Sequence, residues 1–154
     1  MDGRLVGTVA AFRQLVTTLR REKMAGMITR AAGVPLDQPD VQVMVYLLDA
    51  GEPRRVGAIA HGLQVAGPHV TRHVSGLERM GLLERVRDPD DGRAWQITLT
   101  GKGTEVAQRC VEITTAWFAK AMEDWPESDK DELLRLMSKL AGDVSDHAAR
   151  QRLN

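Results

Sequence analysis

The stretch LLERVRDPDDGRAWQITLTGKG, residues 82–103, constrains the fold of this chain more than any other segment. Residues 82–87 and 94–99 alternate apolar and polar side chains, which is the period of half-buried β-strands. The intervening DPDDGR is rich in residues that fix φ, tolerate positive φ or hydrogen-bond their own backbone. The segment therefore predicts a β-hairpin with a charged tip, followed by a long helix that Thr100 caps.

Two short helices are predicted directly before this hairpin. Residues 56–63 and 68–80 each carry apolar side chains along one helical face. Residues 62–67 supply a turn between them, and Pro68 suits the first turn of the second helix. Helices of about eight and about thirteen residues, joined by about four, have the dimensions of a helix-turn-helix. The hairpin that follows makes the predicted module a winged helix.

Long amphipathic helices are predicted on both sides of this module. Residues 4–25 repeat apolar side chains at spacings of three and four, and two more helices are predicted after Thr100, separated by Trp125-Pro126. A further helix begins after Asp37, a good N-cap, and ends at Gly51. The small central module cannot bury all of these apolar faces, so they indicate a subunit interface.

The predicted fold is therefore mainly α with a small β-hairpin. Residues 1–35 are predicted to form an N-terminal dimerisation helix and residues 36–100 a winged helix-turn-helix. Residues 101–154 are predicted to form the C-terminal dimerisation helices.

The charge of the chain is balanced overall but uneven along its length. Lys and Arg number 21 and Asp and Glu number 21, which gives a net charge of zero. Residues 54–87 nevertheless hold six arginines and two glutamates, a local charge of +4, whereas residues 105–146 carry a local charge of −5. A basic centre beside an acidic helical segment is typical of a DNA-binding module attached to a solvated helical module.

Several other classes of protein are disfavoured. The chain has no Gly-rich phosphate loop and no nucleophile elbow, so neither an enzyme nor a cofactor is predicted. No apolar run approaches ~20 residues, which argues against a membrane span. The single cysteine, Cys110, excludes an internal disulfide and fits a reducing compartment, so a cytoplasmic protein is expected. Its place on an apolar helical face predicts a buried, inert thiol with a raised pKa.

The exposed side of residues 68–80 is rich in hydrogen-bond donors that suit base edges and phosphates. The predicted major-groove contacts are Pro68, His69, Thr71, Arg72 and His73. The predicted phosphate contacts are Arg54, Arg55, Arg79 and Arg87. An exposed helix face that contacts nothing would have a similar composition, and any of these arginines could serve solubility alone.

The chain resembles the MarR family of bacterial transcription regulators over essentially its whole length. The resemblance rests on VTR at 70–72, LExxGLLxR at 77–85, DGR at 91–93 and LTGKG at 99–103, in this order and spacing. It implies an obligate homodimer with interlocked terminal helices, bound to a pseudo-palindromic double-stranded DNA operator. It also implies a repressor whose second helix enters the major groove. A small aromatic or anionic ligand that releases the DNA is implied by the resemblance alone.

The resemblance assigns roles within the hairpin. Arg93 would enter the minor groove, where a narrow A·T tract concentrates negative potential. The alternative is a solvated turn arginine. Asp91 would hold the shape of the hairpin tip by pairing with an arginine such as Arg72 or Arg85, and an Asx-turn is the alternative.

Three further interpretations follow from single features. Met44, His61 and Trp117 are candidates for lining a ligand pocket, although Trp117 also fits ordinary core packing. His69 and His73 have metal-ligand spacing, but no Cys or acid within that segment completes a site, so no metal is predicted. A winged helix that binds a protein partner instead of DNA is the alternative function. The hairpin arginine and the local positive charge favour DNA.

Overall fold

A computed structural model describes residues 2–21, 26–28, 30 and 33–152. The chain divides into two compact units, residues 1–115 and 116–154. Helix α1 spans Gly3–Arg21, and the last residues predicted for it, 22–25, lie outside the described residues. The fold is mainly helical with one antiparallel hairpin, which confirms the predicted class.

Helix α3 spans Gln38–Ala50 and begins and ends as its sequence predicts. Asp37 accepts a hydrogen bond from the Asp40 amide at 2.9 Å, and the Asp40 carboxylate accepts one from the Asp37 amide at 3.1 Å. This reciprocal pair is a capping box, which satisfies two amides that have no partner inside the helix. Gly51 ends the helix at φ 66°, in the left-handed region that glycine adopts without steric cost.

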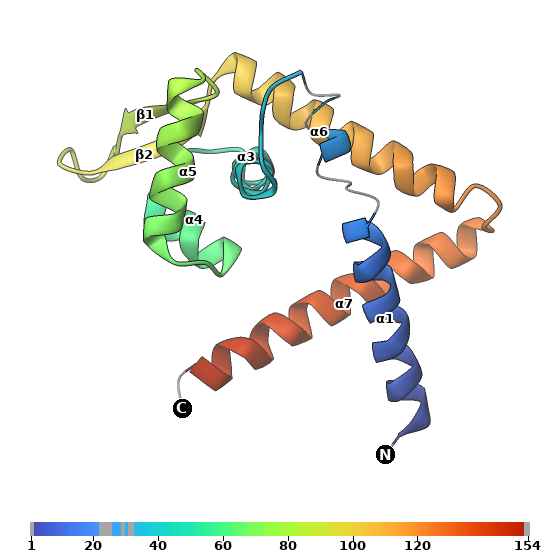
Figure 1. Cartoon of the computed structure of the whole chain (residues 1–154). Helices are drawn as coiled ribbons and strands as arrows, with labels where there is room; N and C mark the ends of the chain where they lie inside the picture. Colours follow the sequence, from blue (N-terminus) through green and yellow to red (C-terminus); the bar gives the residue numbers. More distant parts are fainter. Residues whose placement is uncertain (1, 22–25, 29, 31–32, 153–154) are drawn as a thin grey trace. The chain divides into compact units, whose positions relative to one another are not determined.

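Helices α4 (Val56–Leu63) and α5 (Gly67–Arg79) form the predicted helix-turn-helix. Gln64 turns the chain between them at φ 55°, and Pro68 lies in the first turn of α5. Helices α3, α4 and α5 contact one another in all three pairings, as Figure 1 shows.

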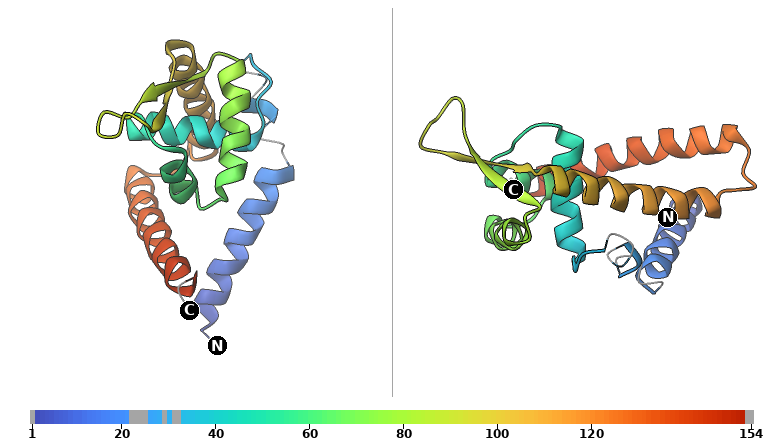
Figure 2. Two further views of the ribbon diagram at one scale, coloured as in Figure 1. Left: turned by 90° about the vertical axis from the view of Figure 1, so that its left-hand side faces the viewer. Right: turned by 90° about the horizontal axis from the view of Figure 1, so that it is seen from above.

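The hairpin consists of β1 (Leu83–Arg87) and β2 (Trp95–Leu99), within one residue of the predicted strands. Its antiparallel register pairs Leu83 with Leu99 and Arg87 with Trp95. Arg54, just before α4, adds a bridge to Ile97 through two backbone hydrogen bonds of 2.9 and 2.7 Å. The tip of the hairpin projects beyond α3, α4 and α5 (Figure 2). We call this hairpin, with its loop at 88–94, the wing.

The core of the first unit lies between α3, α4, α5, the wing and the first half of α6 (Gly101–Ala121). Its largest fully buried side chains are Met44, Ile59, Val70, Val74, Leu77, Leu82, Ile97 and Cys110. Burial raises the pKa of the Cys110 thiol, as predicted from its place on the apolar face of α6.

Thr100 and Gly103 attach the wing to α6. The Thr100 hydroxyl donates to the Gly81 carbonyl at 2.8 Å and accepts from the Gly103 amide at 2.9 Å, so Thr100 caps α6 as predicted. Gly103 lies so close to Leu82 that a Cβ added there would meet the Leu82 carbonyl oxygen at 1.9 Å. A side chain at position 103 would therefore force the wing and α6 apart.

The second unit consists of the end of α6 and α7 (Glu127–Arg152). Ion pairs one turn apart line α7, including Arg135–Glu132 at 2.7 Å and Lys139–Asp143 at 3.1 Å. The same helix exposes Leu134, Leu136, Met137, Leu140 and Val144. No helix among the described residues is long and apolar enough to cross a lipid bilayer.

Candidate nucleic-acid interface

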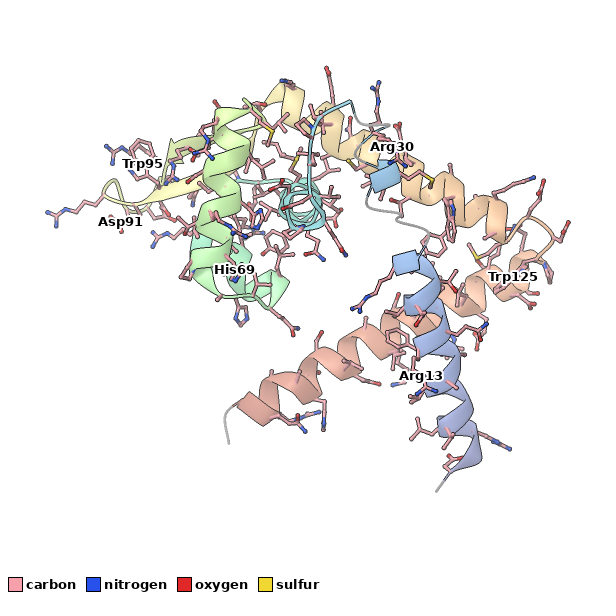
Figure 3. All side chains as sticks on the ribbon, viewed as in Figure 1. Arg13, Arg30, His69, Asp91, Trp95 and Trp125 are labelled. Atoms are coloured by element: carbon pink, nitrogen blue, oxygen red, sulfur yellow. The ribbon has the colours of Figure 1, made fainter. Side chains whose placement is uncertain are left out.

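The N-terminal half of α5 presents a polar surface to solvent. Pro68, His69, Thr71 and Arg72 are all exposed, as predicted for groove-facing residues. Thr71 directs its hydroxyl to the Gly67 carbonyl at 3.1 Å, a bond within its own helix. His69 lies near the N-terminal end of α5, while Asp91 and Trp95 lie on the wing (Figure 3). Contact of these residues with DNA stays a prediction.

His73 is the exception, because the structure turns it inward. Only 8% of this residue is exposed, and its Nδ1 lies 2.8 Å from Asp40 Oδ1 at the start of α3. The prediction that His73 faces the groove is therefore wrong. Position 73 falls one turn from both Val70 and Leu77, at the edge of the buried face of α5, and Asp40 supplies a polar partner there.

Asp88, which the sequence did not single out, organises the wing. Its carboxylate is 4% exposed and accepts four hydrogen bonds. Oδ2 accepts hydrogen bonds from Arg55 Nε at 2.7 Å and from Gln96 Nε2 at 3.1 Å. Oδ1 accepts hydrogen bonds from the backbone amides of Asp90 and Asp91 at 2.9 and 3.1 Å. The hydrogen bond from Arg55, joined by those from the two amides, lowers the pKa of Asp88 to about 2. A buried carboxylate is stable here because donors satisfy both oxygens.

Asp91 pairs with an arginine, as predicted, but its partner is Arg55 and neither Arg72 nor Arg85. Its Oδ1 accepts from the Arg93 amide at 3.1 Å, which is the Asx-turn that the sequence left as the alternative. Its other oxygen lies 3.8 Å from Arg55 Nη2. Of the two predicted partners, Arg85 pairs instead with Glu78 on α5 at 2.8 Å, and Arg72 contacts His73. The Arg85–Glu78 pair raises the pKa of Arg85.

Arg93 lies exposed on the loop of the wing, two residues after Asp91. Its backbone is fixed by the Asx-turn, while its side chain forms no ion pair with any residue that the structure describes. A fixed backbone beneath an unpaired guanidinium is an arrangement that can place positive charge on an external anion.

Three of the four predicted phosphate contacts already have partners within the protein. Arg54 pairs with Glu52 at 2.8 Å, and Arg55 pairs with Asp88. Arg87 donates to the Gly92 carbonyl at 2.9 Å, and its guanidinium lies 4.0 Å from the centre of the Trp95 ring. Arg79 is exposed at the end of α5 and forms no ion pair within the described ranges. Phosphate contact by any of the four stays a prediction.

The three residues predicted to line a ligand pocket differ in burial and belong to two units, so a pocket formed by them stays a prediction. Met44 is only 1% exposed within the core, and His61 is exposed on α4. Trp117 belongs to the second unit, where its ring packs edge-on against Phe118 with the ring centres 5.1 Å apart. The first unit has a hollow of about 270 Å³ beside α5, whose lining includes Pro39, Val65, His69, Val70 and His73.

Comparison with known proteins identifies the module. The profile of the MarR family matches residues 32–94. The HTH-type transcriptional regulator BilQ of Clostridioides difficile is 32% identical over 72 residues, which are 47% of this chain and about half, 49%, of that protein.

Two solved structures share the fold across most of the chain. A MarR family protein from Bacillus stearothermophilus superposes with a TM-score of 0.78 at 23% identity, covering 94% of this chain and 99% of that one. The MepR–DNA complex of S. aureus gives a TM-score of 0.67 at 18% identity, covering 88% of this chain and 95% of the MepR chain.

The three-helix core, the wing and the exposed surface of α5 define a winged helix-turn-helix protein. Over residues 32–94, the chain is similar to the MarR family of transcription regulators.

Proposed function

We propose that this protein is a homodimeric transcriptional repressor that binds a pseudo-palindromic DNA operator. Two features of the structure carry the proposal: α5 has an exposed polar surface, and the wing has an exposed Arg93. The buried Asp88 carboxylate holds the loop of the wing in shape. Helix α5 would read base edges in the major groove through Pro68, His69, Thr71 and Arg72. Arg93 would enter the adjacent minor groove. The solved complex of MepR with DNA supports this use of the fold.

The exposed apolar faces of the terminal helices support the homodimer. On α1 they include Leu5, Val9 and Phe12, which are 54–62% exposed, and α7 exposes a second set that ends at Val144. Apolar faces of this extent are typical of subunit interfaces. Two copies related by a twofold axis would present two α5 helices to half-sites about one helical turn apart.

A small ligand that releases the operator is the remaining part of the proposal. The hollow beside α5 is lined largely by apolar side chains, together with Gln42, His69 and His73. That lining suits a small aromatic or anionic molecule. Such a ligand would act by favouring a protein geometry that no longer matches the spacing of the half-sites.

The binding test uses fluorescence anisotropy on fragments selected from genomic DNA by the purified protein. We expect Arg93→Ala to weaken binding about 5- to 150-fold, which corresponds to ~1–3 kcal/mol. Arg109→Ala is the matched control, because Arg109 is an exposed arginine on α6, outside the proposed interface. Equal affinities of the two variants would contradict the role of Arg93.

Salt dependence distinguishes DNA binding from the alternative of a protein adaptor. Binding to DNA releases counterions, so the affinity must fall steeply between 50 and 200 mM salt, by roughly a thousandfold for six or more phosphate contacts. A protein that binds no selected fragment, or whose binding ignores salt, would support the adaptor.

A further inference from the structure

Three potential metal ligands converge at the start of α3. Asp37, Asp40 and His73 each direct one ligand atom into a space where all three atoms lie within 4.8 Å of one another. His73 Nδ1 is 2.8 Å from Asp40 Oδ1 and 3.7 Å from Asp37 Oδ1. Among the residues that the structure describes, this is the one group of three such side chains. It joins α3 and α5 across 33 positions of sequence.

These separations suit a transition-metal ion. Zinc bonds to nitrogen and oxygen are about 2.0–2.2 Å long, so two ligands of a tetrahedral site lie about 3.3–3.6 Å apart. The observed 2.8 and 3.7 Å lie on either side of that range, so small movements of the side chains would centre an ion. Imidazole with two carboxylates selects ions of the zinc class over calcium or magnesium, which prefer oxygen ligands.

Two side chains of the group are largely buried, and the third is exposed to solvent. The His73 and Asp40 side chains are 9% and 13% exposed, whereas Asp37 is 59% exposed. The second oxygen of Asp40 is fixed by the Asp37 amide in the capping box, which leaves Oδ1 directed at His73. His73 also lines the hollow beside α5, which offers an approach for the ion and room for water ligands.

The second nitrogen of His73 links this group to Arg72. Nε2 lies 3.4 Å from Arg72 Nη2, which can only donate. In a neutral His73 ring, the tautomer that fits both contacts has its proton on Nδ1, which donates to Asp40 while Nε2 accepts. A metal on Nδ1 would require the proton to move to Nε2, through solvent, so that Nε2 becomes a donor. Two donors cannot share a hydrogen bond, and Arg72 would be released from His73.

We propose that Asp37, Asp40 and His73 bind a divalent ion of the zinc class, with water completing the coordination. Occupation of the site locks the start of α3 to α5 and frees the Arg72 guanidinium on the exposed surface of α5. The site goes beyond the proposed function, and its binding test requires no DNA.

The test is a titration of chelator-treated protein with Zn²⁺ by calorimetry, and with Co²⁺ by its visible absorption. We expect one ion per chain, with His73→Gln and Asp40→Asn each weakening it at least about tenfold. Asparagine keeps an oxygen for the capping box, so Asp40→Asn removes charge while the helix start is retained. His69→Gln is the matched control, one turn away and exposed, and should bind the ion as the unaltered chain does.

Two results would overturn the site: no ion bound by the unaltered protein, or equal binding by the unaltered protein, His73→Gln and Asp40→Asn. Circular dichroism confirms that each variant is folded. If His73→Gln or Asp40→Asn does not fold, Asp37→Asn decides in its place, because Asn is an equally good N-cap and Asp37 lies mostly in solvent. Undiminished binding by folded Asp37→Asn would then reject the proposal.

Discussion

At the scale of single residues, Asp88 shows how one buried carboxylate can shape an exposed loop. Its carboxylate accepts hydrogen bonds from two side chains and two backbone amides. These bonds connect the start of α4, strand β2 and the loop of the wing. Arg55, the donor just before α4, has its pKa raised by this hydrogen bond. The position of Arg93 depends on Asp88 through the amide of Asp91, which Asp88 holds.

The pH dependence of the wing follows from the same carboxylate. Because the pKa of Asp88 falls from 3.8 to about 2 on folding, its stabilising contribution is complete above about pH 4. It is lost as the pH falls from about 4 to about 2. NMR titration of the Asp88 carboxyl carbon should show a midpoint near 2.

The control for this titration is Asp88→Asn, which cannot ionise. The difference in melting temperature between the unaltered protein and Asp88→Asn should shrink as the pH falls from 5 to 2.5. A carboxyl that titrates near 4, or a difference that stays constant, would contradict the assigned role.

Residue-level errors in the sequence predictions share one physical origin. Asp88 and Asp91 are both acids in the same turn, and Asp88 differs in being buried against Arg55, which lies 33 positions earlier in the sequence. His73 was assigned to the exposed side of α5 from helical periodicity alone. Its burial was missed because its partner, Asp40, also lies 33 positions away in sequence. Helical periodicity places a side chain at the edge of a buried face, but a non-local partner decides whether it turns in or out.

At the scale of elements, the join between the wing and α6 is the most constrained part of the first unit. The Thr100 hydroxyl forms hydrogen bonds with the Gly81 carbonyl and the Gly103 amide. The Lys102 ammonium donates a hydrogen bond to the Met80 carbonyl at 3.2 Å. The end of α5, the start of the wing and the first turn of α6 are thereby connected within a few residues. Movement of α6 would be transmitted to the wing.

Gly103→Ala tests this join. A Cβ there would meet backbone atoms of Leu82, which cannot rotate away as a side chain can. We expect the free energy of unfolding to fall by about 1–3 kcal/mol or more, as for other overpacked sites. Urea denaturation measures the change.

The matched control is Gly101→Ala, two residues earlier in the same helix. A Cβ at position 101 meets nothing within 4 Å, so that variant should be as stable as the unaltered protein or slightly more stable. Equal stability of the two variants would show that the close approach of Gly103 to Leu82 carries no energetic weight.

The elements themselves were predictable because their ends are encoded locally. Asp37, Gly51 and Thr100 occupy the cap positions predicted for them, and the alternation of residues 82–87 and 94–99 placed both strands within one residue. Caps and periodicity depend on neighbours a few positions away. How the elements meet at the wing and at His73 depends on distant partners, which the sequence pattern does not reveal.

At the scale of the whole molecule, the exposed apolar face of α7 supports the proposed homodimer. Leu136, Met137, Leu140 and Val144 are 43–57% exposed and recur at helical spacing. Charged pairs such as Lys139–Asp143 occupy other positions of the helix. An amphipathic helix of this length gains most of its stability from packing of the apolar face.

Leu140→Glu should convert a dimer into monomers or weaken it at least about tenfold, because a charge would be buried without a partner. Sedimentation equilibrium measures the association directly. Ser138→Glu places the same charge two positions away, on a different side of α7, and should leave association unchanged. Dimerisation of Leu140→Glu with undiminished affinity would exclude this face of α7 from the interface.

The contact between Arg87 and Trp95 has a practical consequence. The indole is 44% exposed on β2 and carries a guanidinium 4.0 Å from its centre, so its emission should respond to any displacement of that charge. The other two tryptophans, Trp117 and Trp125, lie in residues 116–154. With both replaced by phenylalanine, the protein would carry its own optical reporter at the base of the wing loop. Wing motion could then be followed in real time without an attached dye.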